Sequence, residues 1–310
     1  MAEKRPPQLP QGHASPGEPQ TRRLLALAAM GAVTFVWGLS FVSIKVAVEV
    51  LPPMILAFSR FVLASLILGV ILWRREGGIR FGPRDRLAFV VSGVLGVTLY
   101  FFFENNGVKR ISPSAAAIIV TAIPILSMLT DTIVSRTRMG VVKIVGVAAS
   151  AFGVYLVVRH GLSEGGSSLA GYLFMFGAVP VWVIYNFLTR RLFTRRSRIS
   201  IVAMQILYGT VAFIPFMVFE IPLIRWDLIT PVVLLHVVFL GVFCSALAYT
   251  FYVYALNHLG VTATSLFLNL IPVVTVAFSA LFLQDTIGPI QMLGGLLVIA
   301  SVSAVSLWGR

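Results

Sequence analysis

Long apolar runs of about 20 residues dominate this sequence and constrain its fold more than any other feature. A helix needs roughly 20 mostly apolar residues to cross the hydrocarbon core of a bilayer. Ten such runs occur, at residues 24–48, 53–73, 87–105, 114–133, 141–158, 170–189, 199–219, 231–256, 262–283 and 288–308. The least certain boundary is the one between the eighth and ninth runs, where only residues 257–260 interrupt the apolar sequence. We therefore predict an all-α integral membrane protein with ten transmembrane helices.

The composition agrees with a membrane protein and excludes an ordinary soluble enzyme. Only 11% of the 310 residues are charged and 58% are hydrophobic, whereas soluble domains carry roughly 25% charged residues. The net charge of +13 would suggest a nucleic-acid partner in a soluble protein, but here the basic residues cluster in short loops, so we expect none. The single cysteine, Cys244, lies in an apolar run and is interpreted as a small buried hydrophobe. We expect no disulfide, metal or cofactor.

The basic residues also predict the orientation of the chain. With ten helices both termini share one side of the membrane, and 18 Lys and Arg residues fall on that side. The opposite side holds Lys109, Arg110, Arg159 and Arg225. Because cytoplasmic loops carry the excess of Lys and Arg, we predict a multi-pass plasma (inner) membrane protein with both termini in the cytoplasm. Residues 1–22, rich in Pro and Gln, are predicted to form a disordered cytoplasmic tail.

The two halves of the chain match each other at an offset of 148 residues. Pro124 then aligns with Pro272, and Gly146 with Gly294. We predict a first five-helix repeat over 23–158, a connecting loop over 159–169 and a second repeat over 170–310. Five is an odd number, so the second repeat enters the membrane from the opposite side and the repeats are inverted. Inverted repeats are typical of secondary transporters.

The matched prolines indicate helix breaks that could take part in gating. Pro124 and Pro272 each lie midway along an apolar run, where proline removes a backbone hydrogen bond. Such breaks are tolerated where they face protein or a water-filled cavity. Thr121 and Asn269 stand three residues before each proline, and their side chains either satisfy the freed backbone or contact a solute.

Aromatic and polar side chains share helix faces near the middle of the membrane. Trp182, Tyr185 and Asn186 have i, i+3, i+4 spacing, and Trp37 precedes Ser40 by three residues. An aromatic ring beside a polar group suits a solute with an apolar body and a polar head, although helix packing explains the same pattern. Two further tyrosines, Tyr100 and Tyr249, line an aromatic pathway or anchor the helices at the interface.

Few ionisable residues lie at membrane depth, and each is a functional hypothesis. Arg60 is the deepest permanent charge and either attracts an anionic group or orients its helix. Glu104, Asp131 and His236 are the candidates for proton coupling. The alternatives are solvation at the interface for Asp131 and a structural role for His236.

Several of these residues resemble a family pattern when taken together. They are Trp37-Gly38-Leu39-Ser40-Phe41, Arg60-Phe61, residues 115–124, Leu283-Gln284-Asp285 and Gly294. Over residues 24–308 the chain is similar to EamA-type members of the drug/metabolite transporter superfamily. Two departures are Asp285, where the family often has Glu, and Ser135-Arg136-Thr137, which lacks an acid at the equivalent place in the first half.

The resemblance implies two inverted five-helix repeats around a central cavity, with the fifth and tenth helices more peripheral. It implies alternating access and export of amino acids, related metabolites or toxic compounds. It also implies the cavity positions Trp37, Ser40, Tyr100, Thr121, Trp182, Tyr185, Tyr249 and Asn269, with Arg60 at the rim or in support.

We consider three hypotheses for the function of the chain. The leading one is a secondary transporter or facilitator that exports a small amphipathic metabolite, working as a monomer or homodimer in the lipid bilayer. A transporter of nucleotide-linked or lipid-linked solutes would need more cationic residues inside the helices. An intramembrane enzyme would need clustered catalytic groups, whereas the four histidines are dispersed. A primary pump is excluded for this chain, since it has no GxxxxGK[ST] loop.

Overall fold

The protein is described here by a computed structural model, which places residues 20–77, 83–134, 140–163, 167–192 and 196–308. The first half holds α1 (Gln20–Val48), α2 (Pro53–Glu76), α3 (Pro83–Gly93), the π-helical segment η1 (Val94–Leu99), α4 (Tyr100–Arg110), α5 (Pro113–Val120), α6 (Ile123–Val134) and α7 (Val141–Ser163). Within these described ranges no residue is in a β-strand, and the predicted all-α class is confirmed.

The second half continues the same pattern after α8 (Leu169–Leu192). It comprises α9 (Arg198–Ala212), α10 (Ile214–Glu220), the short 3-10 helices η2 (Ile221–Leu223) and η3 (Trp226–Leu228), α11 (Pro231–Phe239), the π-helical segment η4 (Leu240–Leu247), α12 (Ala248–Leu268), α13 (Ile271–Leu283) and α14 (Pro289–Trp308).

Many of these helices are long and apolar enough to cross a membrane. Among the described residues seven segments meet that requirement, or eight when α9 is joined to the helix that follows it across a 42° bend. The bend lies at Phe213, between the end of α9 and the first turn of α10, which holds Pro215. Two shorter apolar helices, Ile271–Leu283 and Pro289–Val305, follow near the end of the chain. The molecule is therefore a multi-pass helical membrane protein, and the number ten remains a prediction.

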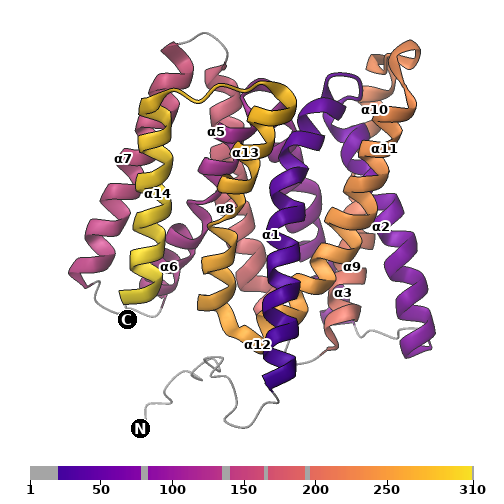
Figure 1. Cartoon of the computed structure of the whole chain (residues 1–310). Coiled ribbons are helices and arrows are strands. Elements are labelled where there is room, and N and C mark those ends of the chain that lie inside the picture. Colours follow the sequence, from indigo (N-terminus) through magenta and orange to yellow (C-terminus); the bar gives the residue numbers. More distant parts are fainter. Residues whose placement is uncertain (1–19, 78–82, 135–139, 164–166, 193–195, 309–310) are drawn as a thin grey trace, which may run out of the picture.

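The helices form an inner group flanked by a separate pair (Figure 1). Helices α7 and α14 pack against each other on one side, α2, α9 and α11 lie on the other, and α1 and α13 lie between them. Gly153 and Gly294 allow the close approach in the pair, because a Cβ on either would lie 2.6 Å from the backbone oxygen of the other. The start of α1 and the end of α14 lie at the same end of the bundle (Figure 1).

Three predicted boundaries differ from the structure. Helix α12 continues without a break across residues 257–260, so the chain first leaves the helical conformation at Asn269. Helix α1 begins at Gln20, inside the predicted tail, whereas residues 1–19 of that tail lie outside the described part. Helix α7 extends to Ser163, inside the predicted loop 159–169. In each case polar residues continue a helix beyond its apolar run, since backbone hydrogen bonds do not depend on hydropathy.

Side chains tie the helix ends together at both ends of the bundle. Where α2 begins, the Glu220 carboxylate accepts hydrogen bonds from the backbone N–H groups of Met54 (2.7 Å) and Ile55 (3.3 Å), which have no partner within their own helix. Where α3 begins, Asp85 forms an ion pair of 2.6 Å with Arg196. These contacts connect the first half of the chain to the second.

Candidate functional site

The middle of the bundle contains two pairs of helix irregularities at matched positions. π-Helical segments are rare, and they occur frequently at functional sites. The π-helical segments Val94–Leu99 and Leu240–Leu247 both interrupt a long helix, and residues 94–99 correspond to residues 242–247 at the offset of 148. The breaks between α5 and α6 and between α12 and α13 are also separated by 148 residues.

The two helix breaks share one hydrogen-bond pattern. In the first, Ala122 N donates to Ile119 O at 2.9 Å and Leu126 N donates to Ala122 O at 3.0 Å. In the second, the corresponding bonds are Leu270 N to Phe267 O at 3.0 Å and Val274 N to Leu270 O at 3.2 Å. The breaks predicted from Pro124 and Pro272 are present, and each proline stands in the first turn of the helix that follows its break.

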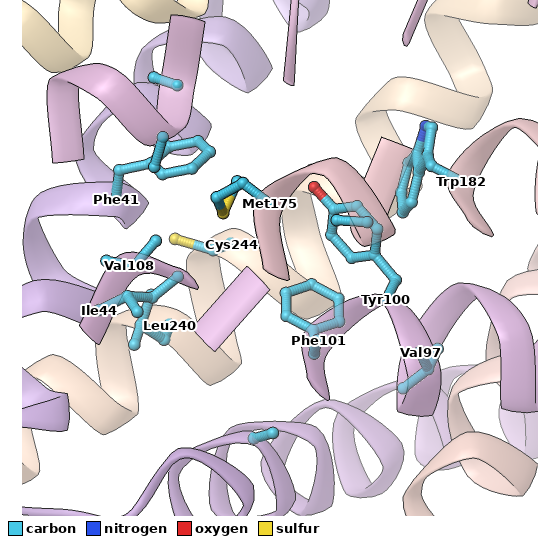
Figure 2. Close-up of a cluster of buried hydrophobic side chains, with 14 of the residues drawn as sticks. Phe41, Ile44, Val97, Tyr100, Phe101, Val108, Met175, Trp182, Leu240 and Cys244 are labelled. Carbon is cyan, nitrogen blue, oxygen red and sulfur yellow. The ribbon is translucent and has the colours of Figure 1, made fainter. Parts of the chain in front are cut away.

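Five aromatic residues predicted to line the site form one chain of ring contacts. Trp182 lies 4.6 Å from Tyr100, 5.0 Å from Tyr185 and 6.3 Å from Tyr249, measured between ring centroids. Trp37 joins from α1, at 5.6 Å from Tyr249. Figure 2 shows Trp182 and Phe101 on either side of Tyr100. We call these five residues, Trp37, Tyr100, Trp182, Tyr185 and Tyr249, the aromatic cluster.

The aromatic cluster is packed rather than open. Four of its side chains are buried and Trp37 is partly buried. In this conformation the rings therefore pack against one another in the region where the family resemblance implies a central cavity. A pocket of about 500 Å³ instead lies where α1 ends, and none of the five rings lines it.

Arg60 lies beside the aromatic cluster and is only 2% exposed. Its Nε donates a hydrogen bond to Ser245 Oγ at 3.0 Å, and its guanidinium carbon lies 4.7 Å from the centre of the Phe101 ring. Such a cation–π contact stabilises a charge removed from water. Its Nη1, however, is buried without a hydrogen-bond partner in the structure. The predicted deep charge is thus held between the two halves of the chain with one donor group unused.

Glu104 is the buried carboxylate of this region. Its Oε1 accepts a hydrogen bond of 2.9 Å from the Tyr100 hydroxyl, one helical turn earlier on α4. No direct ion pair joins Glu104 to Arg60 in the described part of the chain. The carboxylate is therefore connected to the aromatic cluster through Tyr100.

The two polar residues before the matched prolines differ in their bonding. The Thr121 hydroxyl donates to Ala117 O at 3.0 Å, within its own helix. Asn269 is 1% exposed, and neither its Oδ1 nor its Nδ2 has a hydrogen-bond partner. A proline frees the carbonyl four residues before it, which is Val120 O for Pro124 and Leu268 O for Pro272. Neither the Thr121 nor the Asn269 side chain bonds that carbonyl, so the first of the two alternatives does not apply.

Two of the three remaining polar candidates, Ser40 and Tyr185, form hydrogen bonds within the protein. Ser40 donates to Trp37 O at 2.7 Å, one turn back on α1. Tyr185 donates to Gln205 Oε1 at 3.2 Å. Asn186 is partly buried next to Tyr185 on α8. Gln205 was not predicted as a site residue; its amide also donates to Ser92 and Thr189, each at 2.9 Å. A polar residue at the centre of an apolar run was the signal that could have indicated it.

Of the two other candidates for proton coupling, His236 and Asp131, only His236 has a side chain in the described part of the chain. His236 is partly exposed on α11, and no contact in the described part joins it to Glu104. Position 131 falls in α6, but the Asp131 side chain lies outside the described residues. Among the described residues no group of three His, Cys, Asp or Glu side chains could hold a metal ion.

The fold and the site together define a multi-pass helical membrane protein with irregular helices around a polar, aromatic centre. The sequence profile of the EamA-like transporter family matches residues 24–159 and 169–307. The chain belongs to this family, and it is a transporter.

Known relatives agree with this assignment. The chain is 28% identical over 289 residues to an uncharacterized transporter from Archaeoglobus fulgidus, covering 91% of this chain and 96% of the relative. It is 23% identical to a probable amino-acid metabolite efflux pump from Salmonella typhimurium, with coverage of 87% and 91%. It is 24% identical to a probable terminal-alkyne amino-acid exporter from Streptantibioticus cattleyicolor, with coverage of 91% and 93%.

A solved crystal structure supports the fold. It matches with a TM-score of 0.65 at 17% identity and covers 94% of this chain and 97% of that chain. At this identity the likeness shows the fold alone.

Proposed function

We propose that this protein is a secondary transporter or facilitator that exports a small amphipathic metabolite, an amino acid or a related compound, by alternating access. The observation that carries the proposal is that two polar groups of the candidate site, Arg60 Nη1 and the Asn269 amide, are buried without a hydrogen-bond partner. An unsatisfied buried polar group costs about 1–3 kcal/mol. We infer that a solute satisfies both groups when the aromatic cluster opens.

Alternating access requires two halves that can move against each other. We propose ten transmembrane segments arranged as two inverted repeats. The paired π-helical segments and the paired helix breaks support this arrangement, because both pairs follow the same offset of 148 residues. The match of the family profile to residues 24–159 and 169–307 also supports it. The ninth and tenth segments would be α13, together with the end of α12, and α14.

The proposed orientation places both termini in the cytoplasm. The distribution of Lys and Arg supports this orientation. Under it, Asp85 and Arg196 close the cytoplasmic end, and Glu220 binds the start of α2 at the outer end. Opening one end requires only the contacts at that end to break.

The lining groups favour an amino-acid-like solute over a nucleotide-linked one. Aromatic rings accept an apolar side chain, and the Arg60 guanidinium attracts a carboxylate. A nucleotide-linked solute carries several phosphate charges, for which Arg60 is the one deep guanidinium among the described transmembrane residues. The names of the Salmonella and Streptantibioticus relatives, which refer to amino acids, support the same choice.

We assign any proton coupling to Glu104. It is buried and hydrogen-bonded to Tyr100 inside the aromatic cluster, so a change in its protonation would act directly on the solute site. No contact in the described part of the chain joins His236 to the cluster, and Asp131 lies near the cytoplasmic end under the proposed orientation. These two residues are weaker candidates.

An export assay in cells tests the proposal. Bacteria that express the chain would be loaded with amino acids through peptides, and the release of each amino acid would be followed. We expect faster release of at least one amphipathic amino acid, and slower release with Trp182→Phe than with the control Trp226→Phe, whose side chain lies outside the bundle at 69% exposure. Equal release from cells with and without the chain, for the whole set of amino acids, would contradict the proposal.

A further inference from the structure

A pocket of about 500 Å³ lies at the end of the bundle where α1 and α13 end, separate from the aromatic cluster. Its lining includes Lys45 and Glu49 from α1, Ser112 and Pro113 at the start of α5, and Asp285 after α13. We call it the end pocket. Its volume is in the range of small-molecule sites, which run from about 300 to 1,000 Å³. Two carboxylates and one ammonium group line it, an uncommon gathering of charge in a chain with 11% charged residues.

Asp285 is held through one oxygen atom. Its Oδ2 accepts hydrogen bonds from Ser114 at 2.7 Å and from Ser279 at 2.8 Å. Gln284 adopts a left-handed conformation with φ of 55° and turns the chain, so that Asp285 N donates to Ser279 O at 3.3 Å. Within the described part of the chain Oδ1 accepts no hydrogen bond. A carboxylate oriented in this way presents its second oxygen to a donor in the end pocket.

Lys45 is held through all three of its N–H groups. Its Nζ donates to the carbonyls of Val108 (3.2 Å), Lys109 (3.1 Å) and Ile111 (3.3 Å) at the end of α4. Glu49 is the nearest carboxylate, with Oε1 at 3.9 Å, and its side chain is 64% exposed. Carbonyl groups orient the ammonium without neutralising it. Lys45 therefore contributes a fixed positive charge to one wall of the pocket.

The opposite charges in the end pocket match the two charges of an amino acid. We propose that the end pocket binds the headgroup of an amino-acid-like solute, with its ammonium group on Asp285 Oδ1 and Glu49 and its carboxylate directed toward the charge of Lys45. Because the carboxylates outnumber the lysine, the ammonium group is the component that the pocket requires. The apolar lining residues Val46 and Ile111 contact the rest of the solute.

This inference rests on the proposed function and names the headgroup that the transporter selects. The end pocket lies on the outer side under the proposed orientation. It would hold the solute after the aromatic cluster releases it. Binding of an ammonium group in the end pocket gives Glu49 and Asp285 a role in transport, although neither residue belongs to the aromatic cluster.

A thiol placed in the end pocket tests the inference locally. Cys244 is buried and is the single cysteine of the chain, so Val46→Cys introduces one accessible thiol. The full chain would be reconstituted in liposomes, and the rate of labelling by a membrane-impermeant maleimide would be measured. The probes are L-phenylalanine, phenethylamine, which lacks the carboxylate, and 3-phenylpropionate, which lacks the ammonium group.

We expect L-phenylalanine to slow the labelling at the lowest concentration and phenethylamine, which loses the attraction to Lys45, at a concentration about tenfold higher, a difference of about 1.4 kcal/mol. We expect no protection by 3-phenylpropionate, because it lacks the ammonium group and brings a third carboxylate to the two in the pocket. Introducing Asp285→Asn or Glu49→Gln into the Val46→Cys protein should weaken protection by L-phenylalanine about tenfold. Asp285→Asn keeps an oxygen for both serines, and Glu49 is exposed, so both variants should fold. Asp227→Asn, an exposed acid outside the pocket, is the matched control and should change nothing.

Equal protection by 3-phenylpropionate, or protection unchanged in both carboxylate variants, would overturn the inference. Flux of labelled phenylalanine, measured in the same liposomes, distinguishes a failure of the end-pocket inference from a failure of the proposed function. Protection without flux would leave the end pocket standing and remove transport of this solute, whereas flux without protection would remove the end pocket alone.

Discussion

Arg60 on α2 donates a hydrogen bond of 3.0 Å to Ser245 on η4, and so joins residues 185 positions apart in the chain. The contact connects the two halves at the level of the aromatic cluster. Ser245 belongs to a π-helical segment, whose wider turn changes which side chains face inward. An irregular helix thus supplies the group that orients the deepest charge.

Two substitutions of Arg60 distinguish the effect of its charge from the effect of its size. Arg60→Gln keeps a long polar side chain that can still bond Ser245, but it removes the charge that attracts a carboxylate. We expect a flux at least about tenfold lower, equivalent to roughly 1.4 kcal/mol, with an unchanged amount of protein in the membrane. Arg60→Ala should lower the amount as well, because it also removes packing beneath Phe101.

Arg75→Gln is the control for this prediction, since Arg75 is exposed at the end of α2. Flux and membrane abundance would be measured together in the same preparations. Wild-type flux together with wild-type membrane abundance in both Arg60 variants would show that Arg60 has neither a binding nor a structural role.

Replacing Asn269 with leucine should raise the stability of the protein and lower its flux. Asn269→Leu keeps the number and branching of the side-chain heavy atoms and removes two buried polar atoms that have no partner. We expect a higher Tm, since an unsatisfied group costs about 1–3 kcal/mol, together with slower flux. A thermal unfolding curve and a flux measurement on the same protein check the prediction.

Gln205→Leu is the matched comparison, because this buried amide is fully bonded to Ser92, Thr189 and Tyr185. Its Tm should fall, since the substitution removes three buried hydrogen bonds. If Asn269→Leu lowered the Tm in the same way, Asn269 would be a structural residue and not a group waiting for a solute.

The contact between α7 and α14 should depend on its glycines. A Cβ at Gly153 would lie 2.6 Å from the Gly294 oxygen, so Gly153→Ala must push the helices apart. We expect a loss of about 1–3 kcal/mol in the free energy of unfolding, as for other overpacked sites. Gly31→Ala meets nothing within 4 Å and should be neutral or slightly stabilising, because alanine favours the helix. Unfolding in denaturant measures both, and equal stability of the two variants would contradict the tight contact.

The orientation of the chain predicts where a tag can be reached. A short epitope at either terminus should be inaccessible to antibody in intact cells and accessible after permeabilisation. A tag in the loop that carries Arg225 should be accessible in both cases. Detection of a terminal tag on intact cells would reverse the proposed topology.

Hydropathy and matched residues predicted much of the architecture. The apolar runs located the long helices, and the prolines at 124 and 272 located the two breaks, since proline cannot continue the hydrogen-bond pattern of a helix. The π-helical segments were not predicted, because their sequences, such as Val94–Leu99, are ordinary apolar residues. The helical continuation through residues 257–260 was also missed, since polar residues and Gly260 there read as a separator.

The site was predicted in part. Spacing within one helix identified Trp182 and Tyr185, which do lie in contact. Their contacts with Tyr100 and Trp37 depend on how separate helices pack, and a single sequence does not contain that information. The same reason explains why Asp285 and Lys45 were not recognised as walls of one pocket. Residues 240 positions apart come together there only through the packing of α1 against α13.

Flux through the purified chain tests the central claim most directly. Proteoliposomes would receive a panel of radiolabelled amino acids and small organic cations, each with and without an imposed pH gradient. We expect saturable flux of at least one amphipathic amino acid, at least about tenfold lower in Arg60→Gln, and acceleration by the gradient only while Glu104 is intact. The absence of saturable flux for every compound, from protein that is folded and correctly inserted, would contradict transport of an amino-acid-like solute.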